Sequence, residues 1–358
     1  MKNPSIVCLL VCSFAAALFG VRNADAAACT TATSACTEWI SLGSGASRSM
    51  VYRTYPLAER NPAIVRALIV VHGAGRDADN YFRSALAAGF LASALDDTII
   101  IAPRMASNDG DGCKDKLDTN EVSWTCNGVD RWTAGGPAMG NDKITSFDFV
   151  DAIVHKLVNK SAFPNLKVIV LAGHSAGGQF FNRYEMANLV HDEVSIPMTY
   201  VVSNPSSYGY PDSIRPTSLA YPVTAAAPGY IPVPPSEPFQ RFGDGGNCTT
   251  YDRWPYGLRN RTGYTAKISD EQLKRQLVSR PTTYLLGELD ILPLGGFDSS
   301  CAAMAQGPTR LARGLAFTKY VDEKLGAAHK AVIVPLCGHN ARCMFTAEPA
   351  LPLLFPKP

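Results

Sequence analysis

The sequence lacks an excess of charge of either sign, a long hydrophobic run and any internal repeat. Its 358 residues include 33 basic and 31 acidic side chains, which give a formal net charge of +2 and are spread along the chain. This balance excludes a basic patch of the kind that nucleic acid or an anionic membrane surface attracts. We therefore expect no nucleic-acid partner.

The apolar run 6–19 is too short to cross a bilayer as an ordinary transmembrane helix. It follows the basic start Met1-Lys2 and precedes the small residues Ala24-Asp25-Ala26, which is the arrangement of a secretory signal peptide. We expect residues 1–26 to be removed, with cleavage after Ala28 as the alternative. The mature protein is then secreted or periplasmic and keeps no membrane attachment. A lipoprotein anchored through Cys29 is disfavoured, because Ala26 stands where leucine is usual.

Cysteine usage agrees with export. Of the 10 cysteines, Cys8 and Cys12 leave with the signal peptide, and the even number that remains favours disulfides in an oxidising compartment. Eight cysteines allow 105 pairings, and the sequence alone does not choose among them. A zinc site built from Cys337, His339 and Cys343 fits none of the usual spacings, so we expect no metal. Proximity along the chain favours Cys29–Cys36, Cys113–Cys126 and Cys337–Cys343, which leaves Cys248–Cys301 as the fourth pair.

Residues 27–358 are predicted to form a single α/β domain with two insertions. Apolar β-branched runs alternate with helical patterns, which indicates a mostly parallel sheet covered by helices on both faces. Residues 108–141 are rich in glycine and polar side chains and predict a loop insertion, whereas the Pro-, Gly- and Tyr-rich residues of about 205–268 predict a cap or lid. The predicted strands are 38–43, 48–55, 67–71, 98–102, 167–172, 198–203, 282–286 and 331–335, the first two antiparallel; the predicted helices are 80–95, 145–158, 179–190, 269–277 and 309–324.

The segment Gly173-His174-Ser175-Ala176-Gly177 lies between a predicted strand and a predicted helix. In this context G-x-S-x-G is a nucleophile elbow, a sharp turn that presents the serine hydroxyl above the sheet edge, where a base can reach it. The flanking glycines suit a turn that is too tight for a Cβ atom. We therefore predict that Ser175 is a nucleophile.

The base and the acid follow from the same edge of the sheet. Functional groups in open parallel sheets lie beyond the carboxyl ends of the strands. His339 directly follows the strand 331–335, whereas His329 precedes it and falls at the opposite edge. Asp290 lies just past the strand 282–286, with Glu288 and then Asp298 as alternatives. The remaining histidines lie in turns or on helices elsewhere: His72, His155, His174 and His191.

A serine nucleophile of this kind needs backbone donors for the oxyanion. We expect one from the N–H of Ala176, the residue after the serine, and one from Ala74 in the glycine-rich loop after the strand 67–71. The segment Gly73–Ala78 also fits the dinucleotide fingerprint G-x-G-x-x-A. However, the next strand ends in Ala102-Pro103-Arg104, without an acidic residue for a ribose, so no nicotinamide cofactor is expected.

Together these motifs resemble the α/β-hydrolase superfamily of serine hydrolases. The resemblance implies an α/β-hydrolase fold, with a mostly parallel central sheet, helices on both faces and the Pro/Gly/Tyr-rich cap insertion. The segments 204–208 and 298–314 resemble an exported, esterase-like branch without indicating its substrate. The serine excludes the aspartate-nucleophile members, such as haloalkane dehalogenases and epoxide hydrolases. The matching residues occur in the order expected of the superfamily and span nearly the whole mature chain: Val71-His72-Gly73-Ala74-Gly75, Gly173–Gly177, Gly287-Glu288-Leu289-Asp290 and Gly338-His339.

The residues favour an exported serine hydrolase that cleaves carboxylic esters through an acyl-enzyme, without a cofactor. Its substrate would be a small-molecule or polymer ester. A serine peptidase or amidase, or an acyltransferase, would use the same residues, and a non-catalytic binding module would have no reason to keep them all. Aromatic side chains in the predicted loops offer apolar walls for an acyl group, although they can equally be packing. The substrate-contact candidates are Arg76, Tyr81, Trp132 and Tyr208.

Overall fold

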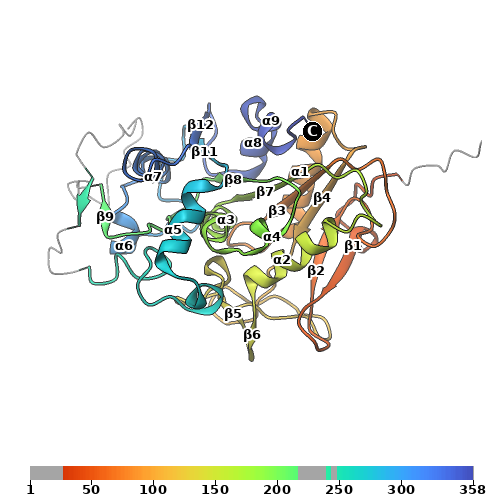
Figure 1. The fold of residues 1–358 in the computed structure, drawn as a ribbon, viewed down its shortest axis with the longest axis horizontal. Coiled ribbons are helices and arrows are strands. Elements are labelled where there is room, and N and C mark those ends of the chain that lie inside the picture. The colour runs from red at the N-terminus through yellow and green to blue at the C-terminus, as the bar shows by residue number, and fades with distance from the viewer. Residues whose placement is uncertain (1–26, 217–238, 243–247, 358) are drawn as a thin grey trace, which may run out of the picture.

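The computed structural model describes residues 27–216, 239–242 and 248–357 (Figure 1). The predicted signal peptide, residues 1–26, lies outside the described residues, as does part of the predicted cap. Within the described ranges, no helix combines the length and the apolar character that a membrane crossing requires.

The core of the protein is an eight-stranded sheet in the order β1-β2-β4-β3-β7-β8-β11-β12. β2 runs antiparallel to both of its neighbours, and the strands from β4 to β12 are parallel. The sequence prediction of two antiparallel edge strands followed by a parallel sheet is confirmed. The strands are β1 (Thr37–Ser41), β2 (Arg48–Arg53), β3 (Arg66–Val71), β4 (Thr98–Pro103), β7 (Val168–His174), β8 (Met198–Ser203), β11 (Thr282–Gly287) and β12 (Lys330–Val334).

The central strands are continuous apolar runs because both of their faces are covered. Every residue of β3, β4 and β7 is buried. Along β3 the side chains alternate between two clusters, since successive residues of a strand point to opposite faces. Ile69 and Val71 belong to one hydrophobic cluster, and Leu68 and Val70 belong to the other.

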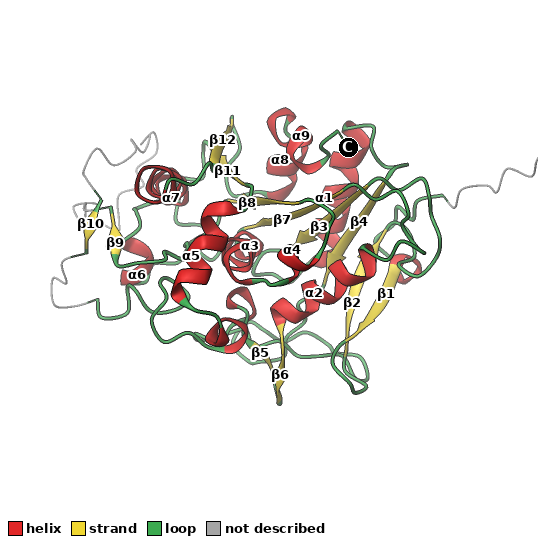
Figure 2. Cartoon of the chain, in the orientation of Figure 1, coloured by secondary structure: helices red, strands yellow, loops and turns green. Residues whose placement is uncertain are grey.

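Helices cover both faces of the sheet (Figures 1 and 2). α2, α3, α5 and α7 contribute to the cluster that contains Ile69, whereas α1, α8 and α9 contribute to the cluster that contains Leu68. The short helices α4 (Val190–Glu193) and α6 (Cys301–Met304) lie in connections. The covering helices are α1 (Ala78–Leu91), α2 (Ser146–Leu157), α3 (Ala176–Ala187), α5 (Asp270–Ser279), α7 (Arg310–Leu325), α8 (Ala341–Thr346) and α9 (Leu351–Leu354).

The two predicted insertions contain little regular structure where they are described. Residues 108–141 include a 3₁₀ turn (Trp132–Ala134) and the strand β5 (Pro137–Ala138), which pairs with β6 (Asn141–Thr145). In the described part of 205–268, β9 (Ile214–Arg215) pairs with β10 (Gln240–Arg241), and a 3₁₀ turn spans Gly263–Lys267. The described part of residues 205–268 is therefore mostly loop.

Four disulfides join loops and short helices of the described chain, and none of their cysteines lies in a strand. The bonded pairs are the three that proximity favours and the fourth that those three leave. Because Cys337 and Cys343 are bonded to each other, neither supplies a thiolate for the zinc site considered from the sequence. The bonds are Cys29–Cys36, Cys113–Cys126, Cys248–Cys301 and Cys337–Cys343.

Candidate active site

Ser175 lies at the sharp turn between β7 and α3, with φ 62° and ψ −118°. A positive φ at a residue other than glycine costs roughly 1–3 kcal/mol and persists only where the surroundings enforce it. Here the enforcement is steric. A Cβ atom on Gly173 would overlap the carbonyl oxygen of Gly177, and one on Gly177 would overlap the carbonyl oxygen of Val71. The two glycines therefore permit the close packing that holds the serine at the apex.

The structure brings Ser175, His339 and Asp290 into one hydrogen-bonded chain. His339 Nε2 lies 2.9 Å from Ser175 Oγ, and His339 Nδ1 lies 2.7 Å from Asp290 Oδ2. Asp290 follows β11 and His339 follows β12, so neighbouring parallel strands deliver both side chains to the same edge. The alternative acids are occupied elsewhere: Glu288 accepts the N–H of Leu336, and Asp298 accepts the hydroxyl of Tyr256.

Asn204 connects the loops that carry Asp290 and His339. It follows β8 with φ 44°, its Oδ1 accepts the N–H of Gly287 at 2.8 Å, and its Nδ2 donates to the carbonyl of Gly338 at 3.4 Å. One buried amide thus fixes the end of β11 and the loop after β12 next to the site. The sequence gives only a weak signal for this role, an asparagine directly after a buried strand.

Arg310 is a buried arginine that pairs with Asp290. Arg310 Nη1 lies 3.4 Å from Asp290 Oδ1, and the exposed fractions of the two side chains are 0% and 1%. Arg310 also donates to Ser206 Oγ at 2.7 Å and to the carbonyl of Gly295 at 2.9 Å. The guanidinium therefore compensates the charge of a carboxylate that water does not reach, and it fixes the loop beside His339. Sequence reasoning missed this residue, because a helix-start arginine is ordinarily solvated.

Ala74 and Ala176 present two free backbone donors next to Ser175. Neither N–H donates a hydrogen bond to any residue that the structure describes. Both alanines line a cavity of about 380 Å³. Unpaired backbone N–H groups beside a serine hydroxyl are the type of donor that a developing oxyanion requires.

His72 holds the loop that carries Ala74. The N–H of Met105 donates to Nε2 of His72 at 2.9 Å, so the ring proton is on Nδ1, which donates to the carbonyl of Gly73 at 2.8 Å. Burial lowers the pKa of His72 to about 4, which keeps this imidazole neutral. The histidine that the sequence places in a turn is thus part of the frame of the site.

A second cavity, of about 610 Å³, opens over Ser175 and His339. Tyr81 lines it, and the Tyr81 hydroxyl is hydrogen-bonded to His174 Nδ1 at 3.0 Å. The His174 ring lies 4.6 Å from the His339 ring between centroids. Burial, followed by the charges of His339 and Arg310, lowers the pKa of His174, so a neutral ring packs against the candidate base.

Two of the four predicted substrate contacts lie along these cavities, Tyr81 in the larger and Trp132 in the smaller. Tyr208 does not, and its prediction is wrong. Its side chain is fully buried and stacks on Phe317 at 4.6 Å between ring centroids, with Tyr284 at its edge. A tyrosine in a Pro- and Gly-rich segment is here a core residue.

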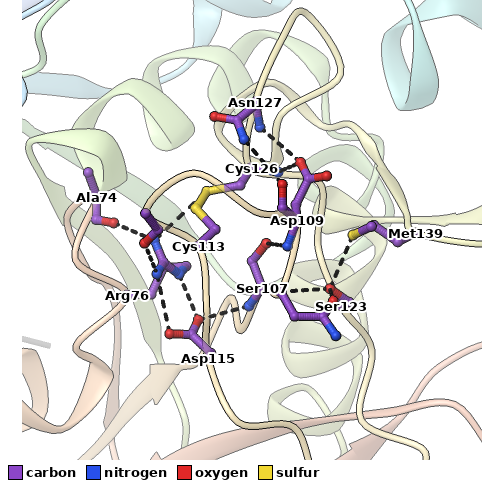
Figure 3. Close-up of a disulfide and its surroundings, with 12 residues drawn as sticks. Ala74, Arg76, Ser107, Asp109, Cys113, Asp115, Ser123, Cys126, Asn127 and Met139 are labelled. Carbon is purple, nitrogen blue, oxygen red and sulfur yellow. Dashed lines mark hydrogen bonds and ion pairs between the residues drawn. A yellow bond between two sulfur atoms is a disulfide. The ribbon is translucent and has the colours of Figure 1, made fainter.

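The prediction for Arg76 is also wrong, because its guanidinium is used within the protein (Figure 3). Arg76 Nε donates to Asp115 at 2.6 Å, and the two Nη atoms donate to the carbonyls of Ala74 and Gly112. Burial alone would raise the pKa of Asp115, but hydrogen bonds from Arg76 and Ser107 lower it below its usual value. Arg76 therefore connects the loop of Ala74 to residues 108–141, where Asp115 is its partner.

Comparison with solved structures shows the fold. No protein-family model and no curated protein matches the chain. LpqC, a poly(3-hydroxybutyrate) depolymerase from Bordetella parapertussis, is similar with a TM-score of 0.55 and 21% identity over 86% of this chain and 84% of that one. Poly(aspartic acid) hydrolase-1 from Sphingomonas sp. KT-1 is similar with a TM-score of 0.51 and 21% identity over 86% of this chain and 95% of that one. With the strand order above, these similarities establish the α/β-hydrolase fold that the motifs predict.

Proposed function

On this α/β-hydrolase fold, we propose that the protein is an exported serine hydrolase that cleaves carboxylic esters through an acyl-enzyme. One observation carries the proposal: the hydrogen-bonded chain from Ser175 through His339 to Asp290 ends beside two free backbone donors. Nucleophile, base, orienting acid and oxyanion donors are the complete set that acyl transfer requires.

The geometry suggests a role for each group. His339 takes the proton of Ser175 as the hydroxyl oxygen attacks the ester carbonyl, and it returns that proton to the departing alkoxide. Asp290 holds the imidazole with its Nδ1 proton toward the carboxylate and stabilises the imidazolium. Water then repeats the attack on the acyl-enzyme with His339 again as the base, which frees Ser175 and releases the acid.

The N–H groups of Ala74 and Ala176 would stabilise the tetrahedral intermediates. Each such donor is worth about 3 kcal/mol of transition-state stabilisation in enzymes of this type. The donors cost no reorganisation, because His72 and the elbow hold both backbone segments in place before substrate binds.

Esters are favoured over amides because an alkoxide leaves more readily than an amine and demands less of the site. A polymeric ester belongs among the substrates to be tested, since one similar structure is named as a poly(3-hydroxybutyrate) depolymerase. An amide-linked polymer should be tested beside it, since the other is named as a poly(aspartic acid) hydrolase. Export is proposed from the signal-peptide pattern of residues 1–26 together with four disulfides, which persist in oxidising compartments.

The test is active-site labelling followed by substrate profiling. We expect a fluorophosphonate probe to label Ser175 and the protein to hydrolyse short p-nitrophenyl esters. Ser175→Ala and His339→Ala should each lower kcat by several orders of magnitude, and Asp290→Asn by roughly 10⁴-fold. Ser161→Ala, at an exposed serine outside both cavities, is the control and should behave as the wild type.

The outcomes separate the candidate functions. If Ser175 is labelled but the protein cleaves only amides, the protein is a peptidase and not an esterase. Absence of labelling in folded protein would contradict catalysis through Ser175. If Glu288→Gln lowers kcat and Asp290→Asn does not, the acid is Glu288.

A further inference from the structure

The smaller cavity beside Ser175 contains hydrogen-bond donors that the protein itself does not satisfy. It has a volume of about 380 Å³ and shares Ala74 and Gly296 with the larger cavity, so the two adjoin. Its lining includes both alanines that offer free N–H groups, but neither Ser175 nor His339. The side chains that line this cavity would therefore contact the part of the substrate on the oxyanion side.

The positions of base and oxyanion donors assign the two cavities to the two halves of an ester. This step rests on the function proposed above. The leaving oxygen must come within hydrogen-bond reach of His339 Nε2 to receive its proton. The alcohol half therefore departs through the larger cavity, which His339 lines, and the acyl half extends into the smaller one.

Gln179 presents a fixed donor to the acyl half. It lies in the first turn of α3, is only 8% exposed and lines the smaller cavity. Nη1 of Arg183 donates to its Oε1 at 3.2 Å, which sets the amide orientation because a guanidinium has no acceptor. Nε2 of Gln179 makes no hydrogen bond with the residues that the structure describes. It is not one of the fully buried side-chain atoms that lack a partner, so it remains accessible from the cavity.

Arg183 keeps this orientation because it is itself held rigidly. It is fully buried and donates to the carbonyls of Pro255 and Thr133 and to Ser207 Oγ, at 3.0, 3.2 and 3.1 Å. Burial lowers its pKa to about 9, so it remains a cation at neutral pH and goes on donating to Gln179. A flip of the Gln179 amide would place its NH₂ group against the Arg183 cation, which offers no acceptor.

The other charged side chains that line the cavity, Arg131 and Asp298, both already have partners in the protein. Arg131 donates through Nη2 to the Tyr256 hydroxyl at 3.2 Å and forms no ion pair with any acid in the described part of the chain. The two oxygens of Asp298 already accept the hydroxyl of Tyr256 at 2.7 Å and the N–H of Ser300 at 3.0 Å. Nε2 of Gln179 therefore remains without a partner in the described chain, and an acceptor on the substrate would satisfy it.

We propose that the acyl half of the substrate carries a hydrogen-bond-accepting oxygen, as a hydroxyl, a carbonyl or a carboxylate, a few atoms from the scissile carbonyl. Nε2 of Gln179 donates to that oxygen. A plain alkyl chain would displace water from Gln179 and Arg131 without replacing its hydrogen bonds, and a site built to bond a polar group discriminates against the analogue that lacks it.

The test compares p-nitrophenyl 3-hydroxybutyrate with p-nitrophenyl butyrate in the whole protein. For each ester, kcat/KM is divided by its rate constant for hydrolysis by hydroxide, which removes differences in intrinsic reactivity. We expect the wild type to prefer the hydroxy ester by about 3- to 10-fold after this correction, the range for one hydrogen bond between uncharged groups. Gln179→Leu should bring the corrected ratio close to one.

Esters with a 3-oxo group or a terminal carboxylate identify which acceptor the site favours, and preference for either over butyrate also supports the proposal. Gln272→Leu on α5 is the control and should keep the wild-type ratio. If Gln179→Leu fails to fold, Gln179→Met serves in its place. Turnover of all these esters without preference, or a ratio that Gln179→Leu leaves unchanged, overturns the inference and leaves the esterase standing. Lack of turnover and of fluorophosphonate labelling instead contradicts the proposed function.

Discussion

Replacing Arg310 by methionine tests whether the acid of the site depends on a buried counter-charge. Methionine preserves much of the length of the side chain and removes its charge. Asp290 is 1% exposed and would keep His339 as its remaining side-chain partner. Breaking a buried ion pair from one side costs about 3–5 kcal/mol, and the 3.4 Å separation places this pair toward the lower end. We expect the free energy of unfolding to fall by about 3 kcal/mol.

The measurement is urea unfolding, followed by circular dichroism, of the wild type, Arg310→Met, Asp290→Asn and the double variant. The cycle is needed because Arg310 also donates to Ser206 and Gly295, and these two losses occur whether or not Asp290 is charged. The double variant should lose less stability than the two single losses added together, and the difference should be at least about 1 kcal/mol. Arg275→Met, at an exposed arginine on α5, is the control and should unfold as the wild type. A coupling energy of zero would refute the reasoning.

Two other predictions concern the frame of the site. The pKa of His72 is about 4 in the fold against 6.5 in the unfolded chain, so its contribution to stability is complete above pH 6.5 and is lost as the pH falls through 4. In urea titrations between pH 7 and 4, the free energy of unfolding should fall less in His72→Gln than in the wild type, by up to about 3 kcal/mol. Parallel plots of the free energy of unfolding against pH for the two proteins would contradict this. The Cys337–Cys343 bond closes the short loop that carries His339. Its replacement by two serines should cost about 2 kcal/mol and lower kcat below the unfolding transition, and an unchanged kcat would contradict the idea that this bond clamps the base.

Local patterns predict the strands and helices of this protein well because each element satisfies its own local rules. β3, β4 and β7 are unbroken apolar runs, and each is buried on both faces, as a parallel interior strand requires. The positions of Ser175, Asp290 and His339 follow from one topological rule, that parallel strands deliver their carboxyl ends to a common edge. No side-chain detail is needed for that step.

Side-chain environments could not be predicted in the same way, because they depend on segments far apart in the sequence. Arg76 pairs with Asp115 of the insertion, and nothing in the local pattern of either segment points to the other. Arg310 and Asp290 likewise meet only once α7 packs behind the loop after β11. Tyr208 fails for the opposite reason, since its Pro- and Gly-rich neighbours suggest an exposed loop while its ring is part of the core.

The central claim is that Ser175 carries the acyl group during turnover, and a rapid acid quench tests it most directly. The protein is mixed with a short p-nitrophenyl ester, quenched within one turnover and digested, and the peptides are weighed by mass spectrometry. We expect the mass of the acyl group on the peptide that contains Ser175, and no such adduct in Ser175→Ala. An acyl group on a different side chain, or ester turnover that survives in Ser175→Ala, would contradict the account.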